Sequence, residues 1–182
     1  IEAQELVAVK STIAVPNQQF QYKTDPAESS AVVSGDASES LSALFSSGVD
    51  SRWEWDEATG LYLKFLSNGS PDTDADGTQI SATNVIVMSP NYVDVEGLPT
   101  AQITGNTDRA FIATGGFLLE GRFDATVAGA PTLFTDLDGN AVYLAPGKTF
   151  VLLPPGEAST AGGVKPGQFQ FELDGQTVTI NL

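Results

Sequence analysis

The 182-residue chain contains no cysteine and no histidine. The lack of cysteine excludes disulfides, zinc–thiolate sites, redox pairs and thiol nucleophiles. The lack of histidine excludes Ser-His-Asp triads, imidazole general bases and histidine metal ligands. A chain of this size can bury enough apolar surface to fold without disulfides, so an exported protein remains compatible with this composition.

Positive charge is scarce. The chain has 8 Lys and Arg against 23 Asp and Glu, which gives a formal net charge of −15. The basic residues are scattered, so the sequence lacks the basic footprint that phosphate backbones require, and nucleic acid is excluded as a partner. The same balance argues against adsorption to an anionic membrane surface. An acidic surface keeps a protein soluble and attracts cations or basic partners.

Long apolar runs are also missing, and none approaches the roughly 20 residues of a membrane-spanning helix. Hydrophobic residues still make up 41% of the chain, while 18 Gly and 10 Pro punctuate it throughout. Short apolar stretches between turn residues are typical of strands. The sequence therefore predicts an all-β fold, mostly antiparallel, that forms a sandwich-like structure or a partly open barrel.

The clearest strand pair in the first half is a hairpin over residues 52–56 and 61–66, with residues 57–60 as its loop. Gly60 suits the left-handed conformation that such a loop needs. A four-residue loop places Trp55 opposite Tyr62 and Trp53 opposite Lys64, whereas a loop longer by one residue changes the pairing. The predicted register allows an aromatic contact and a cation–π contact.

Several further strands are predicted from alternation and turn chemistry. Residues 40–45 suit either helical spacing or alternation, and the nearby turn residues favour a strand. Residues 85–88 are apolar on both faces, which indicates a central strand. Residues 110–113 and 117–123, then 133–135 and 141–144, form two hairpins, and residues 149–153 form the last core strand. Residues 23–39 and 89–100 are expected to be loops, and residues 3–10 form a short helix or an edge strand.

The end of the chain carries a hairpin signal around Asp174-Gly175, which suits a two-residue turn with positive φ angles. Phe169, Phe171, Val178 and Ile180 fall on one face and need a surface to cover them. Residues 154–167 have the composition of a linker. We therefore expect a main β domain at 1–155, a linker at 156–167, and a hairpin at 168–182 that docks on the domain of its own chain.

An acidic segment resembles the first half of a calcium-binding loop. Asp72, Asp74 and Asp76 alternate before Gly77, and such carboxylates can converge on a hard cation. The second half of the pattern fails, because position twelve is Thr83 rather than Glu and no helix flanks the loop. The alternative is a hairpin turn rich in Asp and Gly. Apart from this calcium site, no cofactor is predicted.

Two further groups of side chains are candidates for ligand binding. Trp53, Trp55 and Tyr62 could form a platform on which a sugar stacks, and packing in the core is the alternative. Lys64, Arg109 and Arg122 could bind an anionic ligand, or they could pair with the surplus acids. Paired carboxylates could support glycoside hydrolysis, and four acids are available for it, although no residue is predicted to be catalytic: Glu54, Asp56, Asp74 and Glu120.

The middle of the chain resembles the C-terminal domain of the YerB-like bacterial lipoproteins, a family of unknown function. The resemblance covers roughly residues 20–155, with matching pieces in one order: Trp53-Glu54-Trp55-Asp56, Gly60-Leu61-Tyr62-Leu63-Lys64, Asp74 to Gly77, Asn84-Val85-Ile86-Val87, Gly121-Arg122-Phe123, Phe134-Thr135-Asp136 and Pro146-Gly147-Lys148-Thr149-Phe150. The sequence departs from the family pattern at four places. An Arg is expected at Lys64, a His near Asp72, and Trp at Phe123 and Phe150.

The resemblance implies an exported, lipid-anchored parent protein on the outer face of a bacterial membrane, with an N-terminal domain that this sequence lacks. With the motifs above, it predicts a monomeric, non-catalytic binding or scaffolding module whose partners are that domain and an envelope component or small ligand. The rival hypothesis is a carboxylate-dependent hydrolase of a cell-wall glycan. The ligand-binding positions predicted are Trp53, Trp55, Tyr62, Lys64, Asn84, Arg109 and Arg122.

Overall fold

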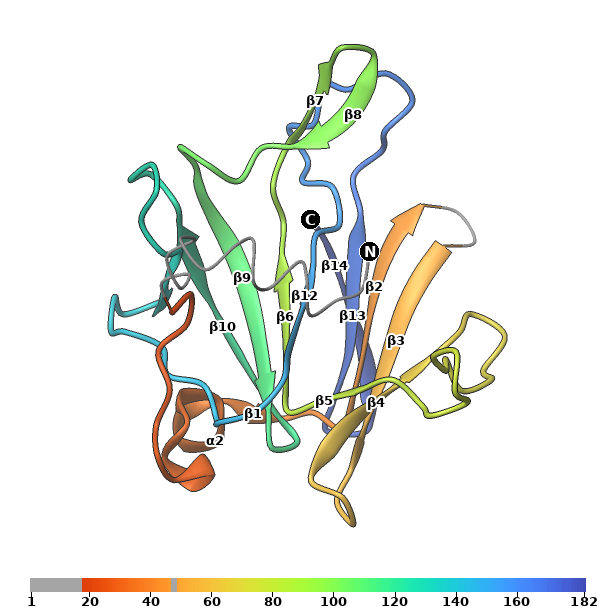
Figure 1. Cartoon of the computed structure of the whole chain (residues 1–182), viewed down its shortest axis with the longest axis vertical. Helices are drawn as coiled ribbons and strands as arrows, with labels where there is room; N and C mark the ends of the chain where they lie inside the picture. Colours follow the sequence, from red (N-terminus) through yellow and green to blue (C-terminus); the bar gives the residue numbers. More distant parts are fainter. Residues whose placement is uncertain (1–17, 47–48) are drawn as a thin grey trace, which may run out of the picture.

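The computed structural model describes residues 18–46 and 49–182, and nearly all of its regular structure is strand. Figure 1 shows the arrangement of these elements. In chain order they are the following: η1 (Pro26–Glu28), α2 (Ser30–Ser34), β1 (Asp36–Ala37), β2 (Ser40–Ser46), β3 (Val49–Asp56), β4 (Leu61–Phe65), β5 (Ser81–Ala82), β6 (Asn84–Met88), β7 (Tyr92–Val95), β8 (Leu98–Ala101), β9 (Thr107–Thr114), β10 (Phe117–Asp124), β11 (Leu133–Asp136), β12 (Thr149–Leu152), β13 (Gln168–Leu173) and β14 (Gln176–Asn181).

The strands form two sheets and a separate hairpin. The first sheet has the order β1-β10-β9-β6-β12, with β11 also paired to β10, and is called the β9 sheet here. The second has the order β14-β13-β2-β3-β4-β5 and is called the β3 sheet. Within the described residues every strand pair is antiparallel except β6 with β12. The all-β prediction is confirmed, and the sheets do not close into a barrel.

The main core lies between the two sheets and follows from the alternation of each strand. Trp53 and Tyr62 come from the β3 sheet and are fully buried. Phe111 from β9 meets Phe169 from β13 at a ring separation of 4.5 Å. The largest apolar side chains of the two sheets therefore interlock along one layer.

A second core lies on the opposite face of the β9 sheet. Ile86 and Ile112 point to this side and are fully buried, and Ala31 of α2 covers part of it. Phe20 and Phe134 pack against one another there at 5.9 Å between ring centroids. Because β6 has a core on each face, all five of its residues are buried. The prediction of a central strand at residues 85–88 is confirmed.

The β3–β4 hairpin has the predicted register. Trp53 pairs with Lys64, and Trp55 pairs with Tyr62 at a ring separation of 5.1 Å. The Asp56 carboxylate accepts hydrogen bonds from the N–H and the hydroxyl of Thr59, which fixes the four-residue loop. Gly60 adopts a φ of 68° at the position that the loop requires.

The C-terminal hairpin forms where the sequence predicts it, and its first strand extends the β3 sheet. Asp174 and Gly175 have φ angles of 52° and 72°, as a two-residue primed turn requires. Strand β13 pairs with β2 over Leu41–Leu44, and Phe169 is fully buried as a result. The hairpin thus covers the free edge of β2 in the same chain.

The segment predicted as a linker is held in place by backbone hydrogen bonds. The N–H groups of Thr160 and Ala161 both donate to the carbonyl of Tyr92, and Gly167 donates to Pro155. Ala161 is buried. Residues 154–167 therefore pack along β7, and the boundary between a main domain and the hairpin stays a prediction.

Three segments differ from the sequence-based expectation. Residues 23–39, expected as a loop, contain η1, α2 and β1, because Asp25 caps Ala27 and Pro26 suits the first helical position. Residues 89–100 contain most of the β7–β8 hairpin, whose turn at Glu96-Gly97 has positive φ angles. Residues 141–144, expected to form a hairpin with residues 133–135, pair with β11 at a single isolated bridge, between Thr135 and Ala141.

The helix-or-strand alternative for residues 3–10 lies outside the described residues. Within the described part of the chain, no helix has the length and apolar character needed to cross a membrane.

Burial of Phe169 predicts that β13 contributes strongly to stability. We expect Phe169→Ala to lower the free energy of unfolding by roughly 3–5 kcal/mol, the range for truncating a buried aromatic ring. Glu172→Ala, an exposed position on the same strand, serves as the control and should change stability by less than about 0.5 kcal/mol. Urea unfolding followed by circular dichroism measures both. Equal effects from the two variants would show that the hairpin does not stabilise the sandwich.

Candidate functional site

In the described part of the chain, each of the two sheets ends at a strand that borders the same hollow. Strand β5 ends the β3 sheet and β12 ends the β9 sheet. Residue Thr83 alone separates β5 from β6, so the chain crosses from one sheet to the other at this point. The N–H groups of Thr83 and Asn84 both donate to the carbonyl of Lys148, which ties the crossing to the start of β12.

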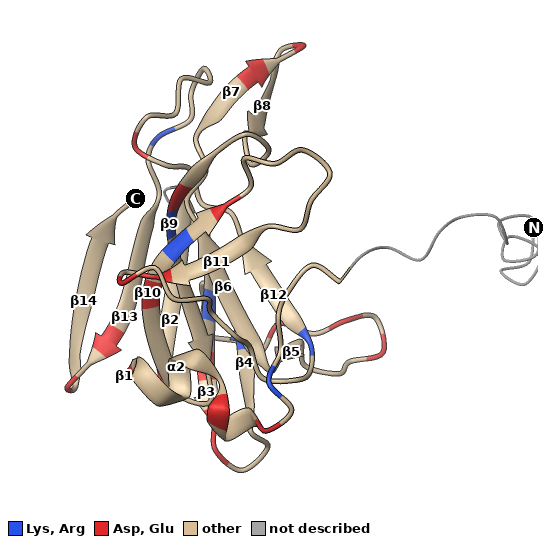
Figure 2. Ribbon diagram, turned by 90° about the vertical axis from the view of Figure 1, so that its left-hand side faces the viewer, with Lys and Arg blue, Asp and Glu red and all other residues tan. Residues whose placement is uncertain are grey.

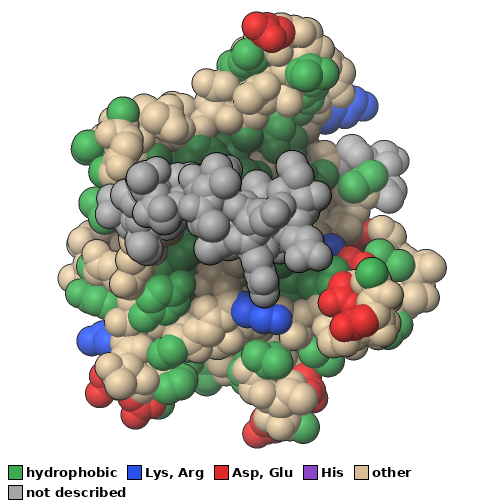
Figure 3. All heavy atoms as spheres, viewed as in Figure 1, with side chains coloured by type: hydrophobic (Ala, Val, Ile, Leu, Met, Phe, Trp, Pro, Cys, Tyr) green, Lys and Arg blue, Asp and Glu red, His purple; other side chains and the backbone are tan. Residues whose placement is uncertain are grey.

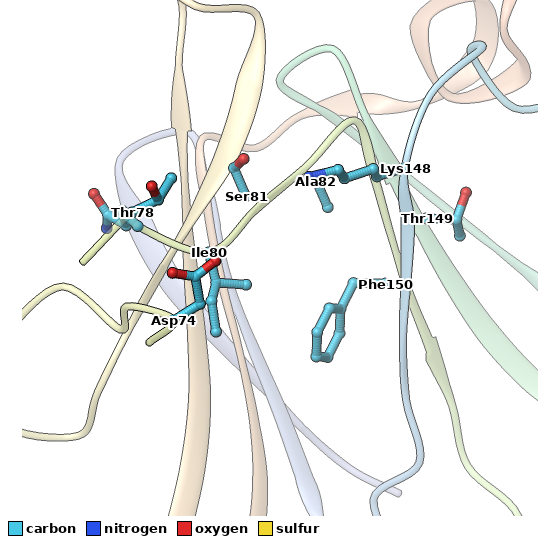
Figure 4. Close-up of a pocket in the computed structure, with 9 residues that line it drawn as sticks. Asp74, Thr78, Ile80, Ser81, Ala82, Lys148, Thr149 and Phe150 are labelled. Carbon is cyan, nitrogen blue, oxygen red and sulfur yellow. The ribbon is translucent and has the colours of Figure 1, made fainter. Parts of the chain in front are cut away.

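A hollow of about 450 Å³ lies between these edges and is called the edge groove here. Figure 4 shows Asp74 and Ile80 on one side and Phe150 on the other, with Lys148 and Ala82 along the rim. Figure 3 shows the same side of the molecule, where acidic side chains gather over the loop between β4 and β5. The full lining is as follows: Asp74, Thr78, Gln79, Ile80, Ser81, Ala82, Lys148, Thr149 and Phe150.

The apolar surface of the groove is fixed from behind by the core. The ring of Phe150 packs on Trp53 at 4.8 Å between centroids, and Lys64 Nζ lies 5.5 Å from the same ring. Lys64 also forms an ion pair with Asp72, at 2.6 Å, in which both side chains are about 20% exposed. This pairing with an acid is the alternative that the sequence offered for Lys64, and it holds the Phe150 wall in one position.

The acidic loop between β4 and β5 folds back as a tight turn, and Figure 2 shows its acidic residues. The Asp74 carboxylate accepts the N–H of Asp76, and the Asp76 carboxylate accepts the N–H of Thr78. Hydrogen bonds from Thr78 and Asp74 lower the pKa of Asp76 to about 2. Within residues 18–46 and 49–182, no group of three or more acidic side chains is placed to hold a metal ion. These contacts match the hairpin turn rich in Asp and Gly that was the alternative to a calcium loop, and calcium binding itself is a question for titration.

Asn84 is fully buried beneath the groove, and its amide makes four hydrogen bonds. Its oxygen accepts from the Thr114 hydroxyl and the Ala145 N–H, at 2.8 and 3.2 Å. Its nitrogen donates to the Ala145 carbonyl and the Thr149 hydroxyl, at 2.9 and 3.2 Å. The side chain therefore positions the loop before β12, and its amide is hydrogen-bonded within the chain.

A second, mostly apolar hollow of about 480 Å³ lies beyond that loop. Trp55, which is half-buried, is the one predicted ligand-binding residue that lines it. The rest of its lining contains no ionisable side chain: Pro26, Ala27, Val32, Gly60, Thr83, Thr114, Gly115, Ala145 and Pro146. This Trp55 pocket offers apolar contact without a charge to orient a ligand.

The other two aromatic candidates belong to the core, which was the alternative to a sugar platform. Trp53 is 0% exposed, and its indole N–H donates to the Ser51 hydroxyl at 3.1 Å. Tyr62 is also 0% exposed. Its burial raises the pKa of the hydroxyl well above the usual value, and the nearby Gly116 backbone offsets this only in part.

The two arginines are neighbours on the β9 sheet, away from Lys64. Arg109 and Arg122 pair in register across β9 and β10. Arg109 donates from Nε and one terminal nitrogen to the same oxygen of Glu120, at 3.1 and 2.8 Å, and lies over Phe111. Arg122 is exposed. Of the three predicted cations, the structure thus brings Arg109 and Arg122 together and places Lys64 on the other sheet.

Lys148, Ile80 and Phe150 line the groove, although the sequence analysis did not select them as ligand-binding positions. Two of them lie in the stretch Pro146-Gly147-Lys148-Thr149-Phe150, where a turn precedes a strand. Gly147 has a φ of 145° and lies against Thr83, so that a Cβ there would meet the threonine hydroxyl at 2.0 Å. A Pro-Gly turn before a short strand was the available signal for these residues.

The fold and the groove define a two-sheet, all-β domain with a lined opening at one edge. The chain belongs to the family described as "Protein of unknown function (DUF3048) C-terminal domain", which matches residues 41–151, more than half of the sequence. Membership confirms the family resemblance seen in the sequence.

One similar solved structure is the crystal structure of the YerB protein from Bacillus subtilis. The two share 12% sequence identity and a TM-score of 0.60, over 82% of this chain and 49% of that one. The chain thus spans about half the length of this relative, and the likeness supports the fold. None of the curated proteins matches the sequence.

The buried amide of Asn84 predicts a stability effect that a surface amide does not share. We expect Asn84→Ala to cost roughly 2–4 kcal/mol of unfolding free energy, because Thr114 and both backbone groups of Ala145 lose their partner. Asn181→Ala is the matched control, since that amide is exposed and, among the described residues, bonds Gln168 alone. Urea denaturation compares the two. A loss below about 0.5 kcal/mol for Asn84→Ala would contradict the role given to this residue.

The acidic loop makes a prediction about calcium. We expect about 5 mM calcium, which exceeds the dissociation constants of roughly 0.1–1 mM of weak extracellular sites, to leave the melting temperature unchanged. The reason is that Asp72 is paired with Lys64 and the other two carboxylates close the turn. A ligand that binds only the folded state must raise that temperature. A calcium-dependent rise that the double variant Asp74→Asn, Asp76→Asn abolishes would instead establish the site.

Proposed function

We propose that this chain is a non-catalytic binding or scaffolding module of an exported bacterial envelope protein, and that the edge groove is its binding site. The observation that carries the proposal is the lining of the groove. A cation at Lys148, a carboxylate at Asp74 and the apolar Ile80 and Phe150 converge on one hollow. A few polar groups around an apolar wall is the usual composition of a site that orients a ligand.

The rigidity of the walls supports binding at this place. Phe150 is held by Trp53 and by the Lys64–Asp72 pair, while Asn84 fixes the loop that leads to Lys148. A site with preformed walls loses little entropy when a ligand enters. The Trp55 pocket beside it lacks charged groups, so the edge groove is the better site for a specific partner.

The rival function, hydrolysis of a cell-wall glycan, needs two carboxyl groups facing one another across a cleft. Of the four acids considered from the sequence, Asp74 lies on the edge groove, and the remaining lining residues carry no carboxylate. Glu54 pairs with Arg52, Glu120 pairs with Arg109, and Asp56 closes the hairpin loop. These contacts favour binding over hydrolysis.

An envelope location is part of the proposal and rests on the family resemblance and on composition. The chain carries a net charge of −15 and no cysteine, which suits a protein that stays soluble outside the cell without disulfides. The other half of a longer parent protein is the first partner to consider, because the similar YerB chain is about twice as long as the part matched.

Sedimentation with isolated bacterial envelopes tests the function. The chain is mixed with washed envelope fragments and centrifuged, and the bound fraction is measured. We expect Lys148→Glu to lower that fraction at least about five-fold, because it reverses the charge at the groove rim. Lys165→Glu makes the same charge change at an exposed site on the 154–167 segment and should bind like the unmodified chain.

Two results would contradict the proposal. One is equal sedimentation of the two charge-reversed variants, which would place binding elsewhere on the molecule. The other is a steady release of soluble glycan fragments during the incubation, which a hydrolase would cause and a binding module would not.

A further inference from the structure

Among the residues that the structure describes, strand β12 has one side without a strand partner, and it borders the edge groove. Its other side pairs in parallel with β6, in the register Thr149 to Asn84 and Val151 to Ile86. The Asn84 N–H bonds the Lys148 carbonyl, so residues 148, 150 and 152 direct their backbone groups toward β6. The N–H and C=O groups of Thr149 and Val151 therefore point to the free side.

These four groups have no backbone partner among residues 18–46 and 49–182. Thr149 and Phe150 also line the edge groove, so the free side of β12 and the hollow are continuous. Free strand edges accept an extended peptide as an added strand, and neighbouring pockets then select its alternate side chains.

We propose that the edge groove binds an extended peptide with a basic side chain, which adds to β12 as a further strand of the β9 sheet. The proposal rests on the binding function assigned to this groove and names its ligand class. Phe150 faces the opening between the sheets, and a peptide residue opposite it must point to the same side.

That position fits lysine or arginine. The aliphatic part of either side chain lies on the apolar surface of Ile80 and Phe150, and the charged end reaches Asp74 across the groove. Asp74 lines the groove while its Oδ1 accepts the N–H of Asp76, so the turn holds this carboxylate at the opening. At the rim, Lys148 can take a carboxylate of the same peptide.

Charge favours a basic peptide over a second copy of the chain as the partner of β12. Each copy carries a net charge of −15, so pairing two β12 edges would bring two acidic loops together. A basic peptide meets the opposite field. A foreign strand of suitable charge is therefore favoured at this edge over self-association.

The test uses a fluorescein-labelled peptide of seven residues, with threonine and valine alternating around a central lysine, and measures binding to the full chain by fluorescence anisotropy. Two N-methylated forms carry methyl groups on either the odd or the even residues. Because alternate N–H groups point to one side of a strand, strand addition predicts that one form loses binding at least about ten-fold and that the other retains it.

Variants of the chain test whether the backbone N–H groups of β12 itself take part in binding. Val151→Pro removes an N–H that points to the free edge and leaves the β6 ladder intact, as an edge strand tolerates. We expect it to weaken peptide binding about ten-fold, the effect of roughly 1.4 kcal/mol. Val151→Ala loses the same packing, keeps the N–H and should change the affinity less than about three-fold.

The basic side chain is tested with Asp74→Asn and with a peptide that has norleucine in place of lysine. We expect each change to weaken binding up to about five-fold, and both together to weaken it no further than one alone. Additive losses would show that the lysine does not reach Asp74.

The outcomes separate the peptide proposal from the binding function. The peptide proposal alone is overturned if envelope sedimentation depends on Lys148 but the peptide does not bind. It is also overturned if sedimentation depends on Lys148 and both N-methylated peptides lose binding equally. The edge groove is ruled out as the binding site if Lys148→Glu and Lys165→Glu both lose sedimentation, or if neither does. Two further results would show that the partner of β12 is part of this chain or of a second copy, and would overturn the proposal. One is peptide binding that appears only after residues 1–17 are deleted. The other is a dimer in solution that Val151→Pro dissociates.

Discussion

The buried amide of Asn84 is the contact on which the candidate site depends. It lies where the chain passes from the β3 sheet to the β9 sheet, and it bonds both backbone groups of Ala145. A buried amide with four partners has a single satisfactory orientation, and a lost partner leaves a polar group unsatisfied in the core. Because Lys148 and Phe150 follow Ala145 by only a few residues, this orientation sets where the groove walls stand.

Electrostatics divides the few basic residues of the chain between structural and surface roles. Lys64 and Arg109 each contact an acid and an aromatic ring, which fixes them in the fold. Lys148 is exposed and has no acid partner among the described residues. In a chain with 23 acids, Lys148 thus places an unpaired positive charge beside the hollow, where it can attract a negative group of a ligand. The groove therefore presents both signs of charge within a mostly acidic molecule.

Much of the fold could be predicted because its signals are local. The Trp55–Tyr62 register follows from a four-residue loop, and the primed turn at Asp174-Gly175 follows from residue type. The β7–β8 hairpin was missed because its turn, Glu96-Gly97, places a non-glycine residue at positive φ and its strands are short. Helix α2 was missed because five residues carry too little periodicity to identify.

The site could be predicted only in part, since it depends on contacts between distant residues. Asp74 and Trp55 were selected from the sequence and do line hollows. Neither Phe150 nor Lys148 could be placed beside Asp74, because nothing local indicates that β12 pairs in parallel with β6 across 65 residues. The positions where the sequence departs from the family pattern gave an indirect signal. Of these, Lys64, Asp72 and Phe150 meet around one wall of the groove.

An exposed strand edge is a risk for aggregation, and acidic charge near β12 is one way in which natural proteins control it. The loop at residues 72–77 stands across the groove from the edge, so a second acidic copy is repelled before its strand can pair. The same charge attracts a basic segment, and it does so at the point where four backbone groups have no backbone partner among the described residues. Protection against self-pairing and selection of a basic partner thus follow from one arrangement of charge.

The short length of β12, four residues, limits how much backbone pairing can contribute, so selectivity must come from the side chains that enter the groove.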